Sequence, residues 1–120
     1  MPPVNNITRF LDSQKVRYFA FETPAEKLGA RETAEFLNVP LAQVFKTIVV
    51  TREKPKKPIL AVIPGANILD LKPLAAFLAE KKVHLPTERE AEQLTGLQAG
   101  GISPLALINK GFQVVLDSSA

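Results

Sequence analysis

The chain has 120 residues, of which 46% are hydrophobic and 22% are charged, and its formal net charge is +3. This length favours one domain around a single core, and the composition excludes a disordered or a fibrous chain. The absence of cysteine and the presence of a single histidine exclude disulfides, cysteine nucleophiles and multi-histidine metal sites. No apolar run approaches the roughly 18 residues of a membrane span, so we expect a cytoplasmic protein without a membrane or metal partner.

The N-terminal third of the sequence predicts two helices separated by a strand. Apolar residues at helical spacing after an asparagine cap predict a first helix from residue 5 or 6 to about residue 14. The aromatic stretch RYFAFE, residues 17–22, predicts a strand that ends before a Thr-Pro pair. A second helix is expected over residues 30–37, with Ala34 and Leu37 on its buried face.

Two apolar runs, at residues 44–51 and 59–63, are the candidates for the centre of a sheet. Both have apolar residues at odd and at even positions, which is typical of strands buried on both faces. The connector REKPKKP is short, so the two strands are expected to form an antiparallel hairpin. Its basic residues are explained by a solvated loop, with a nucleic-acid contact as the alternative.

The second half of the chain predicts two helices, two strands and a loop. In chain order these are a helix over 70–80, a short strand over 83–85, a helix over 87–94, a loop over 98–107 and a strand over 112–116. Asp70 is a good N-cap for the first of these helices. Thr87 followed by Glu90 has the spacing of a capping box, and Gly96 is expected to end that helix.

Lys46 is the first candidate for a functional residue, because it interrupts an otherwise apolar strand. It shares the pleat face of Val44, Ile48 and Val50. An unpaired ammonium buried there costs several kcal/mol, so the lysine reaches solvent, pairs with a carboxylate, or faces a cleft that takes an anionic ligand. The residues alone leave these roles open, and β-propensity by itself explains the neighbouring Thr47.

A second candidate is the glycine-rich segment around Gly100 and Gly101. Paired glycines let backbone N–H groups approach an oxyanion or phosphate, and Ser103 adds a hydroxyl, although an ordinary glycine turn explains the same residues. His84 lies between apolar neighbours in the expected short strand, which favours a structural role. Without a second histidine or a GxSxG elbow, a serine triad is not supported.

Five segments resemble, in content and order, the YbaK/EbsC family of aminoacyl-tRNA deacylases: VFKTIVV, LAVIPGANILDLKPLA, the short strand KKV, EQLTGLQAGGISPLAL and VVLDSSA. That family includes the editing domain inserted in bacterial prolyl-tRNA synthetases and its free-standing relatives. The resemblance covers essentially the whole chain, residues 1–120. It implies a single α+β domain with a mixed, curved β-sheet flanked by helices.

The resemblance also implies an activity and a site. The activity is hydrolysis of the ester of a mischarged tRNA, typically the tRNA for proline, without a metal or any other cofactor. Lys46 matches the functional lysine of the family, which lies near the charged 3′ end of the tRNA, so it is the implied catalytic residue. The residues implied to bind the substrate are Thr47, Gly100, Gly101, Ile102, Ser103 and Asp117. A bound water and groups of the substrate would do much of the attack.

A trans-acting deacylase is therefore the primary hypothesis, with the 3′ end of an aminoacyl-tRNA and prolyl-tRNA synthetase as partners. The alternative is a non-catalytic module of the same fold that binds tRNA or a synthetase, since many members continue beyond LDSSA with a segment that this sequence lacks. Thr23 and Leu97 stand where cysteine-editing members often have aromatic residues, so the amino acid removed is not assigned. A DNA-binding regulator would rest only on the positive charge and has no recognition-helix signal.

Overall fold

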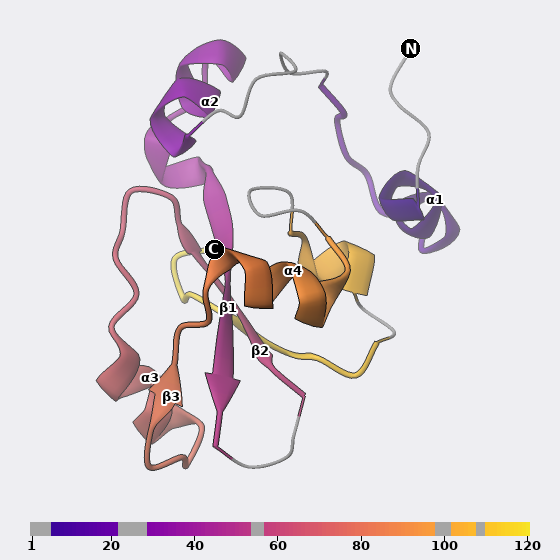
Figure 1. Cartoon of the computed structure of the whole chain (residues 1–120). Helices are drawn as coiled ribbons and strands as arrows, with labels where there is room; N and C mark the ends of the chain where they lie inside the picture. The colour runs from indigo at the N-terminus through magenta and orange to yellow at the C-terminus, as the bar shows by residue number, and fades with distance from the viewer. Residues whose placement is uncertain (1–5, 22–28, 54–56, 98–101, 108–109) are drawn as a thin grey trace.

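The computed structural model describes residues 6–21, 29–53, 57–97, 102–107 and 110–120. Its elements, in chain order (Figure 1), are α1 (Asn6–Ser13), α2 (Ala30–Leu37), the short helix η1 (Leu41–Gln43), β1 (Phe45–Arg52), β2 (Ile59–Pro64), α3 (Leu71–Phe77), β3 (Val83–His84), α4 (Glu88–Thr95), the short helix η2 (Pro104–Leu107) and β4 (Gln113–Leu116). None of the helices in these ranges is long and apolar enough to cross a membrane.

The four strands form one mixed sheet in the order β3-β1-β2-β4. β1 pairs antiparallel with both β2 and β3, whereas β2 pairs in parallel with β4. The short β1–β2 connection permits only an antiparallel hairpin, while the long path through α3, β3 and α4 lets β4 return in parallel. The predicted hairpin and the α+β class with a mixed sheet are confirmed.

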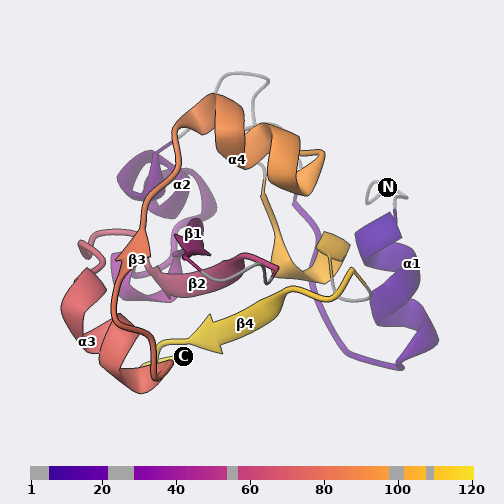
Figure 2. The same cartoon turned by 60° about the horizontal axis from the view of Figure 1, so that its bottom comes forward.

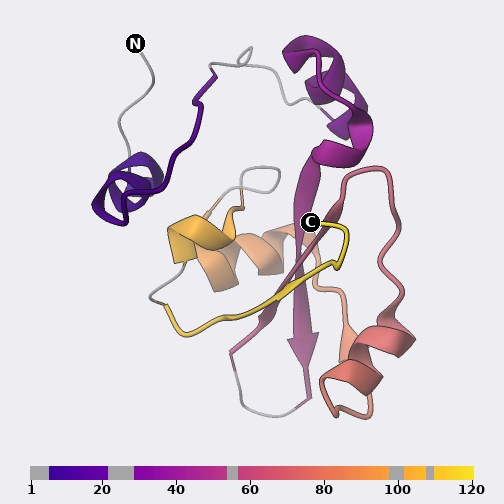
Figure 3. The same ribbon diagram turned by 180° about the vertical axis from the view of Figure 1, so that it is seen from behind.

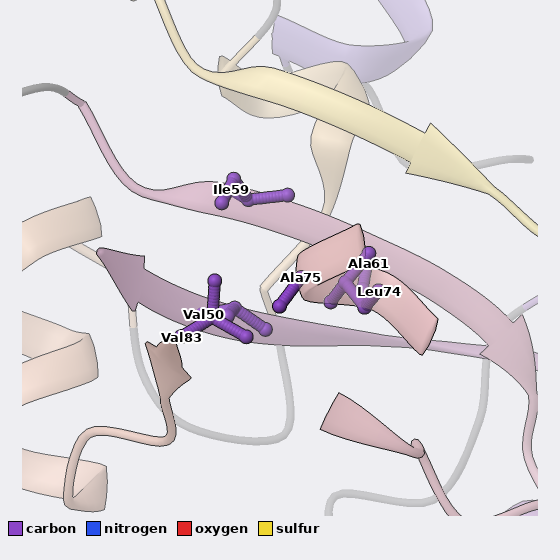
Figure 4. Close-up of a cluster of buried hydrophobic side chains, with 6 residues drawn as sticks. All are labelled: Val50, Ile59, Ala61, Leu74, Ala75 and Val83. Carbon is purple, nitrogen blue, oxygen red and sulfur yellow. The ribbon is translucent and has the colours of Figure 1, made fainter. Parts of the chain in front are cut away.

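Both faces of the central hairpin are packed, as the apolar runs predict. On one face (Figure 4) α3 and β3 cover a cluster made of Val50, Ile59, Ala61, Leu74, Ala75 and Val83. On the other face Val49 and Leu60 pack under Ala91 of α4 and Leu107 of η2. Figure 2 shows α3 and α4 on different sides of the strands. All six residues of β2 are buried, so this strand is the centre of the core.

The predicted helix caps are confirmed at both ends of α4 and at the start of α3. The Asp70 carboxylate accepts the N–H of Lys72 at 3.3 Å. The Thr87 hydroxyl accepts the N–H of Glu90 at 3.1 Å, and the Glu90 carboxylate accepts the N–H of Thr87 at 3.0 Å. Gly96 ends α4 at φ 74°, in the left-handed region that glycine adopts without strain.

The predicted strand over residues 17–22 is wrong for the part that is described, because residues 17–21 form no strand. Aromatic residues favour a strand only where a neighbouring strand offers a surface to pack on. Figure 3 shows this segment leaving α1 at a distance from the sheet, whose edges are β3 and β4. Phe19 and Phe21 are accordingly exposed.

The predicted helix over residues 70–80 is too long, because α3 ends at Phe77. Ala79 has φ 57°, and the N–H of Glu80 donates to the carbonyl of Ala75 at 2.9 Å, which closes the helix. This turn brings the Glu80 carboxylate to 3.6 Å from the Arg52 guanidinium. A second difference is that the described part of the predicted loop over 98–107 contains η2.

Candidate active site

Lys46 and Thr47 lie in the first half of β1, on opposite faces of the sheet. Lys46 pairs with Ile63 of β2, and Thr47 pairs with Val62. Both are half-buried, whereas Val50 further along the strand is fully buried. Within the described residues no carboxylate forms an ion pair with Lys46. The first half of β1 therefore carries a half-buried cation that no described carboxylate neutralises.

A cavity of about 680 Å³ opens beside this half of β1. Its walls come from the start of α2, the start of β1, the end of β2 and the segment that leads into η2. The lining residues are Gly29, Ala30, Thr33, Val44, Phe45, Lys46, Thr47, Val62, Gly65, Ile102, Ser103, Pro104 and Leu105. The structure thus brings four of the predicted site residues to one hollow: Lys46, Thr47, Ile102 and Ser103.

Ser103 offers a hydroxyl at the wall of this cavity. Its Oγ accepts the N–H of Leu105 at 3.2 Å, and its carbonyl accepts the N–H of Ala106 at 3.2 Å, so it opens η2. The first of these bonds uses a lone pair of Oγ and leaves the O–H able to donate. The predicted residues Gly100 and Gly101 lie outside the described residues.

Gly65 closes the base of the cavity by a steric requirement that the sequence analysis missed. Its N–H donates to the carbonyl of Val44 at 2.7 Å. A Cβ on Gly65 would lie 2.2 Å from the Cβ of Ala30, a distance that real side chains do not show. Only glycine therefore lets the start of α2 pack this closely on the end of β2. The turn sequence PGAN, residues 64–67, was the signal in the sequence that pointed to a glycine requirement at this position.

Asp117 lies in a different hollow from Lys46. Its N–H donates to the carbonyl of Val62 at 2.9 Å, which extends the pairing of β4 with β2 and leaves one strand between Asp117 and β1. Its carboxylate accepts hydrogen bonds from the hydroxyl and the N–H of Ser119, and these hold the pKa of Asp117 below its ordinary value. The hollow beside it is lined mainly by residues 67–70 before α3, by α3 itself and by the end of β4.

His84 is remote from the cavity in the described fold. It is exposed at the end of β3, and its Nε2 lies 3.5 Å from the Glu53 carboxylate. In the described ranges no three histidine, aspartate or glutamate side chains gather in a way that could hold a metal ion. Among the described lining residues, the chemistry available at the cavity is that of one ammonium, the three hydroxyls of Thr33, Thr47 and Ser103, and backbone groups.

Comparison with known sequences gives a match over most of the chain. Residues 24–120 match the family described as the aminoacyl-tRNA editing domain. EbsC of Enterococcus faecalis, named as a Cys-tRNA(Pro)/Cys-tRNA(Cys) deacylase, is 36% identical over 117 residues, which cover 96% of this chain and 70% of EbsC. The proline–tRNA ligase of Streptococcus thermophilus is 33% identical over 86 residues, which cover 72% of this chain and 13% of the ligase.

Two solved structures share the fold. A crystal structure described as a trans-editing enzyme for prolyl tRNA synthetase superposes with a TM-score of 0.75 at 25% identity, covering 93% of this chain and 69% of that one. The hypothetical protein APE2540 superposes with a TM-score of 0.82 at 22% identity, covering 94% and 73%. Both agree with the expected architecture of a small domain with a mixed sheet and flanking helices.

Proposed function

We propose a substrate and a catalytic arrangement for this chain, which belongs to the aminoacyl-tRNA editing domain family. It is an aminoacyl-tRNA deacylase, an enzyme that hydrolyses the ester between an amino acid and the 3′ end of a tRNA. The substrate we propose is a tRNA for proline that carries a wrong amino acid. The name of EbsC and the similar segment within proline–tRNA ligases support this choice.

The observation that carries the arrangement is the half-buried Lys46 at the cavity, without a carboxylate partner among the described residues. A desolvated ammonium attracts an anion more strongly than one in water. The 3′ end of an aminoacyl-tRNA has a phosphate next to the ester, and the ester oxygen gains negative charge during hydrolysis. Lys46 neutralises this negative charge at the 3′ end and is the catalytic residue of the proposal.

The remaining groups position the ester and stabilise the transition state. Water attacks the ester carbonyl, the tetrahedral intermediate carries an oxyanion, and its collapse releases the free amino acid and the 3′ hydroxyl of the tRNA. The hydroxyls of Thr47 and Ser103 bind the substrate beside Ile102, and backbone N–H groups of Gly100 and Gly101 supply donors for the oxyanion. Asp117 acts from the neighbouring hollow by fixing the end of β4.

The proposal extends to a partner and a compartment. Proline–tRNA ligases contain a segment similar to 72% of this chain. We therefore expect this chain to act in the cytoplasm on tRNA released by prolyl-tRNA synthetase, either free or in contact with that enzyme. Co-purification of the two proteins, with and without tRNA, tests whether they touch.

The test of the function is a deacylation assay over a panel of misacylated tRNAs, including Cys-tRNA and Ala-tRNA for proline. We expect hydrolysis of at least one, and a loss of about 10²–10³-fold in kcat for Lys46→Ala, the range seen when one charge-stabilising group is removed. Lys82→Ala removes an exposed lysine outside the cavity and should leave the rate unchanged. Binding of tRNA without turnover of any substrate by the wild type would overturn the proposal in favour of a binding module.

A further inference from the structure

The segment that follows α1 exposes aromatic side chains to an unusual degree. Phe19 is 89% exposed and Phe21 is 60% exposed, and neither belongs to a described core cluster. Their ring centroids are 6.4 Å apart and the rings are inclined by 35°, so the two rings are not stacked on each other. Each ring therefore keeps a flat face available to a ligand.

This segment is held in a defined position rather than trailing from the helix. Lys15 has φ 57°, and the N–H of Val16 donates to the carbonyl of Leu11 at 3.0 Å, which turns the chain back along α1. The Tyr18 hydroxyl donates to the Asp12 carboxylate at 2.9 Å, a bond that also raises the pKa of Tyr18. The aromatic rings are thus presented by a chain that is anchored to α1 at two points.

Positive charge accompanies the rings. Lys15 and Arg17 are exposed, and residues 15–21 contain no acidic residue. A hollow of about 920 Å³ runs between α1 and the segment, lined by Asp12, Val16, Arg17, Tyr18, Phe19 and Ala20. Phe19 and Arg17 line this groove, while Lys15 and Phe21 are exposed outside its lining. Exposed aromatic rings with cations beside them are the features with which proteins bind unpaired nucleotides, because bases stack on the rings while cations meet the phosphates.

The groove lies near the proposed active site. α1 packs against η2, and the first two residues of η2, Pro104 and Leu105, line the cavity that contains Lys46. A single strand that runs from Lys46 over η2 would therefore reach α1 and the segment after it.

We propose that residues 15–21 form a stacking platform for the single-stranded nucleotides adjacent to the aminoacyl end of the tRNA. Phe19 and Phe21 stack on bases, and Lys15 and Arg17 contact phosphates. This inference rests on the proposed function, because it takes the ligand to be the substrate of the same domain. An apolar protein partner is less well matched, because Arg17 lines the groove and Lys15 is exposed beside it. The acidic residue of the groove, Asp12, accepts a hydrogen bond from the Tyr18 hydroxyl.

The chain contains no tryptophan, so Phe19→Trp introduces a single fluorescent reporter. Stacking of a base on that indole quenches its emission, so we expect quenching on titration with uncharged tRNA and with a short single-stranded oligonucleotide of the tRNA 3′ sequence. Quenching should weaken at high salt, because phosphate contacts release counterions. A titration with blunt RNA duplex is the control, and equal quenching by the duplex would overturn the stacking assignment.

Kinetics separate this platform from the active site. On mischarged tRNA the double variant Phe19→Ala/Phe21→Ala should raise KM at least tenfold, since each stacked base contributes a several-fold gain in affinity. On an aminoacyl adenosine, which has the ester but lacks the neighbouring nucleotides, its rate should stay within twofold of the wild type. Phe77→Ala removes a ring that is 74% exposed on α3 and should change neither.

The other outcomes each contradict one claim. An equal loss on both substrates would show a structural role and overturn the platform, as would an unchanged KM on tRNA. Phe19→Leu/Phe21→Leu keeps apolar side chains without a flat ring, so wild-type kinetics for that variant would replace stacking by simple apolar contact. If the wild type hydrolyses neither substrate while the Trp reporter still responds to single strands, the proposed function fails and the platform stands.

Discussion

Lys46 and Arg52 are two cations of the same strand that the fold treats in opposite ways. At the end of β1, Arg52 meets Glu80 at 3.6 Å, with only 8% and 4% of the two side chains exposed. The guanidinium also donates to the Gln113 side chain at 2.9 Å and to the Lys57 carbonyl at 3.2 Å. At the start of the same strand, Lys46 is half-buried beside a cavity and has no carboxylate partner in the described ranges.

The difference between Arg52 and Lys46 is whether described residues of the protein compensate for the lost hydration of the charge. A buried charge stabilises a protein only when a partner and hydrogen bonds compensate for its lost hydration, and Arg52 has both. No carboxylate among the described residues compensates Lys46, and we propose that the substrate supplies the negative charge. The far end of β1, at Arg52, is thus structural, and its start, at Lys46, is the end that we propose to be functional.

The largest effect is expected at the functional end. Lys46→Met keeps the length of the side chain and removes its charge, so kcat should fall by about 10²–10³-fold. The free energy of unfolding should not fall by more than about 0.5 kcal/mol, because no carboxylate among the described residues loses an ion pair. Urea denaturation together with the deacylation assay measures both. A stability loss as large as the activity loss would mean that Lys46 is a structural residue.

The reverse pattern is expected at the structural end. Arg52→Met removes the guanidinium that lies 3.6 Å from the buried Glu80 carboxylate, which should lower the free energy of unfolding by about 3 kcal/mol. At temperatures where the variant is folded, kcat on mischarged tRNA should stay within a fewfold of the wild type. The double variant Arg52→Met/Glu80→Met should recover part of the stability. A double variant less stable than Arg52→Met would contradict the ion-pair explanation.

A substitution at Gly65 should change the shape of the cavity and lower the stability by less than Arg52→Met does. Gly65→Ala places a methyl group against Ala30, so α2 must shift and the unfolding free energy should fall by about 1–3 kcal/mol, the usual cost of overpacking. KM and kcat should both worsen because α2 forms one wall of the cavity. Gly96→Ala is the matched control: it strains a left-handed residue at the end of α4, where a Cβ meets open space. Activity lost equally in both variants would sink the packing argument.

The smallest effect is expected at the capping box of α4. Thr87→Ala should cost about 1 kcal/mol of stability without changing activity. Hydrogen bonds from Thr87 lower the pKa of Glu90, so this carboxylate stabilises the fold above its unfolded pKa, about 4.3, and the contribution is lost as pH falls through the lower folded value. The stability difference between wild type and Glu90→Gln, followed by urea denaturation from pH 7 to 3, should therefore shrink towards low pH. A constant difference would contradict the assignment.

Local sequence signals were sufficient for most elements of the fold. The caps at Asp70, Thr87 and Gly96 were predicted because each depends on a side chain or a glycine within one turn of the helix end. The β1–β2 hairpin was predicted because both strands have apolar residues at odd and at even positions and are joined by a short connector. Lys46 stood out for the same reason, as a charge in an apolar strand.

The errors arose where an element depends on distant parts of the chain. RYFAFE has the composition of a strand, but at residues 17–21 no sheet edge is within reach, so Phe19 and Phe21 are exposed instead. The helix predicted to reach residue 80 stops at Phe77, and the turn that follows takes Glu80 to Arg52, 28 residues earlier in the chain. Neither outcome can be read from local propensity, because each is decided by a tertiary partner.

The strands of the central hairpin, the caps at Asp70, Thr87 and Gly96 and the unusual lysine could be predicted from the sequence alone, since they follow from the period of apolar residues and from local capping. Only the tertiary structure decided that Ile102 and Ser103 share a cavity with Lys46 while Asp117 lies across one strand, in another hollow. The same holds for Gly65, whose role appears only when α2 is packed against β2. A cavity is a relation between segments far apart in the chain, and its shape is set by packing.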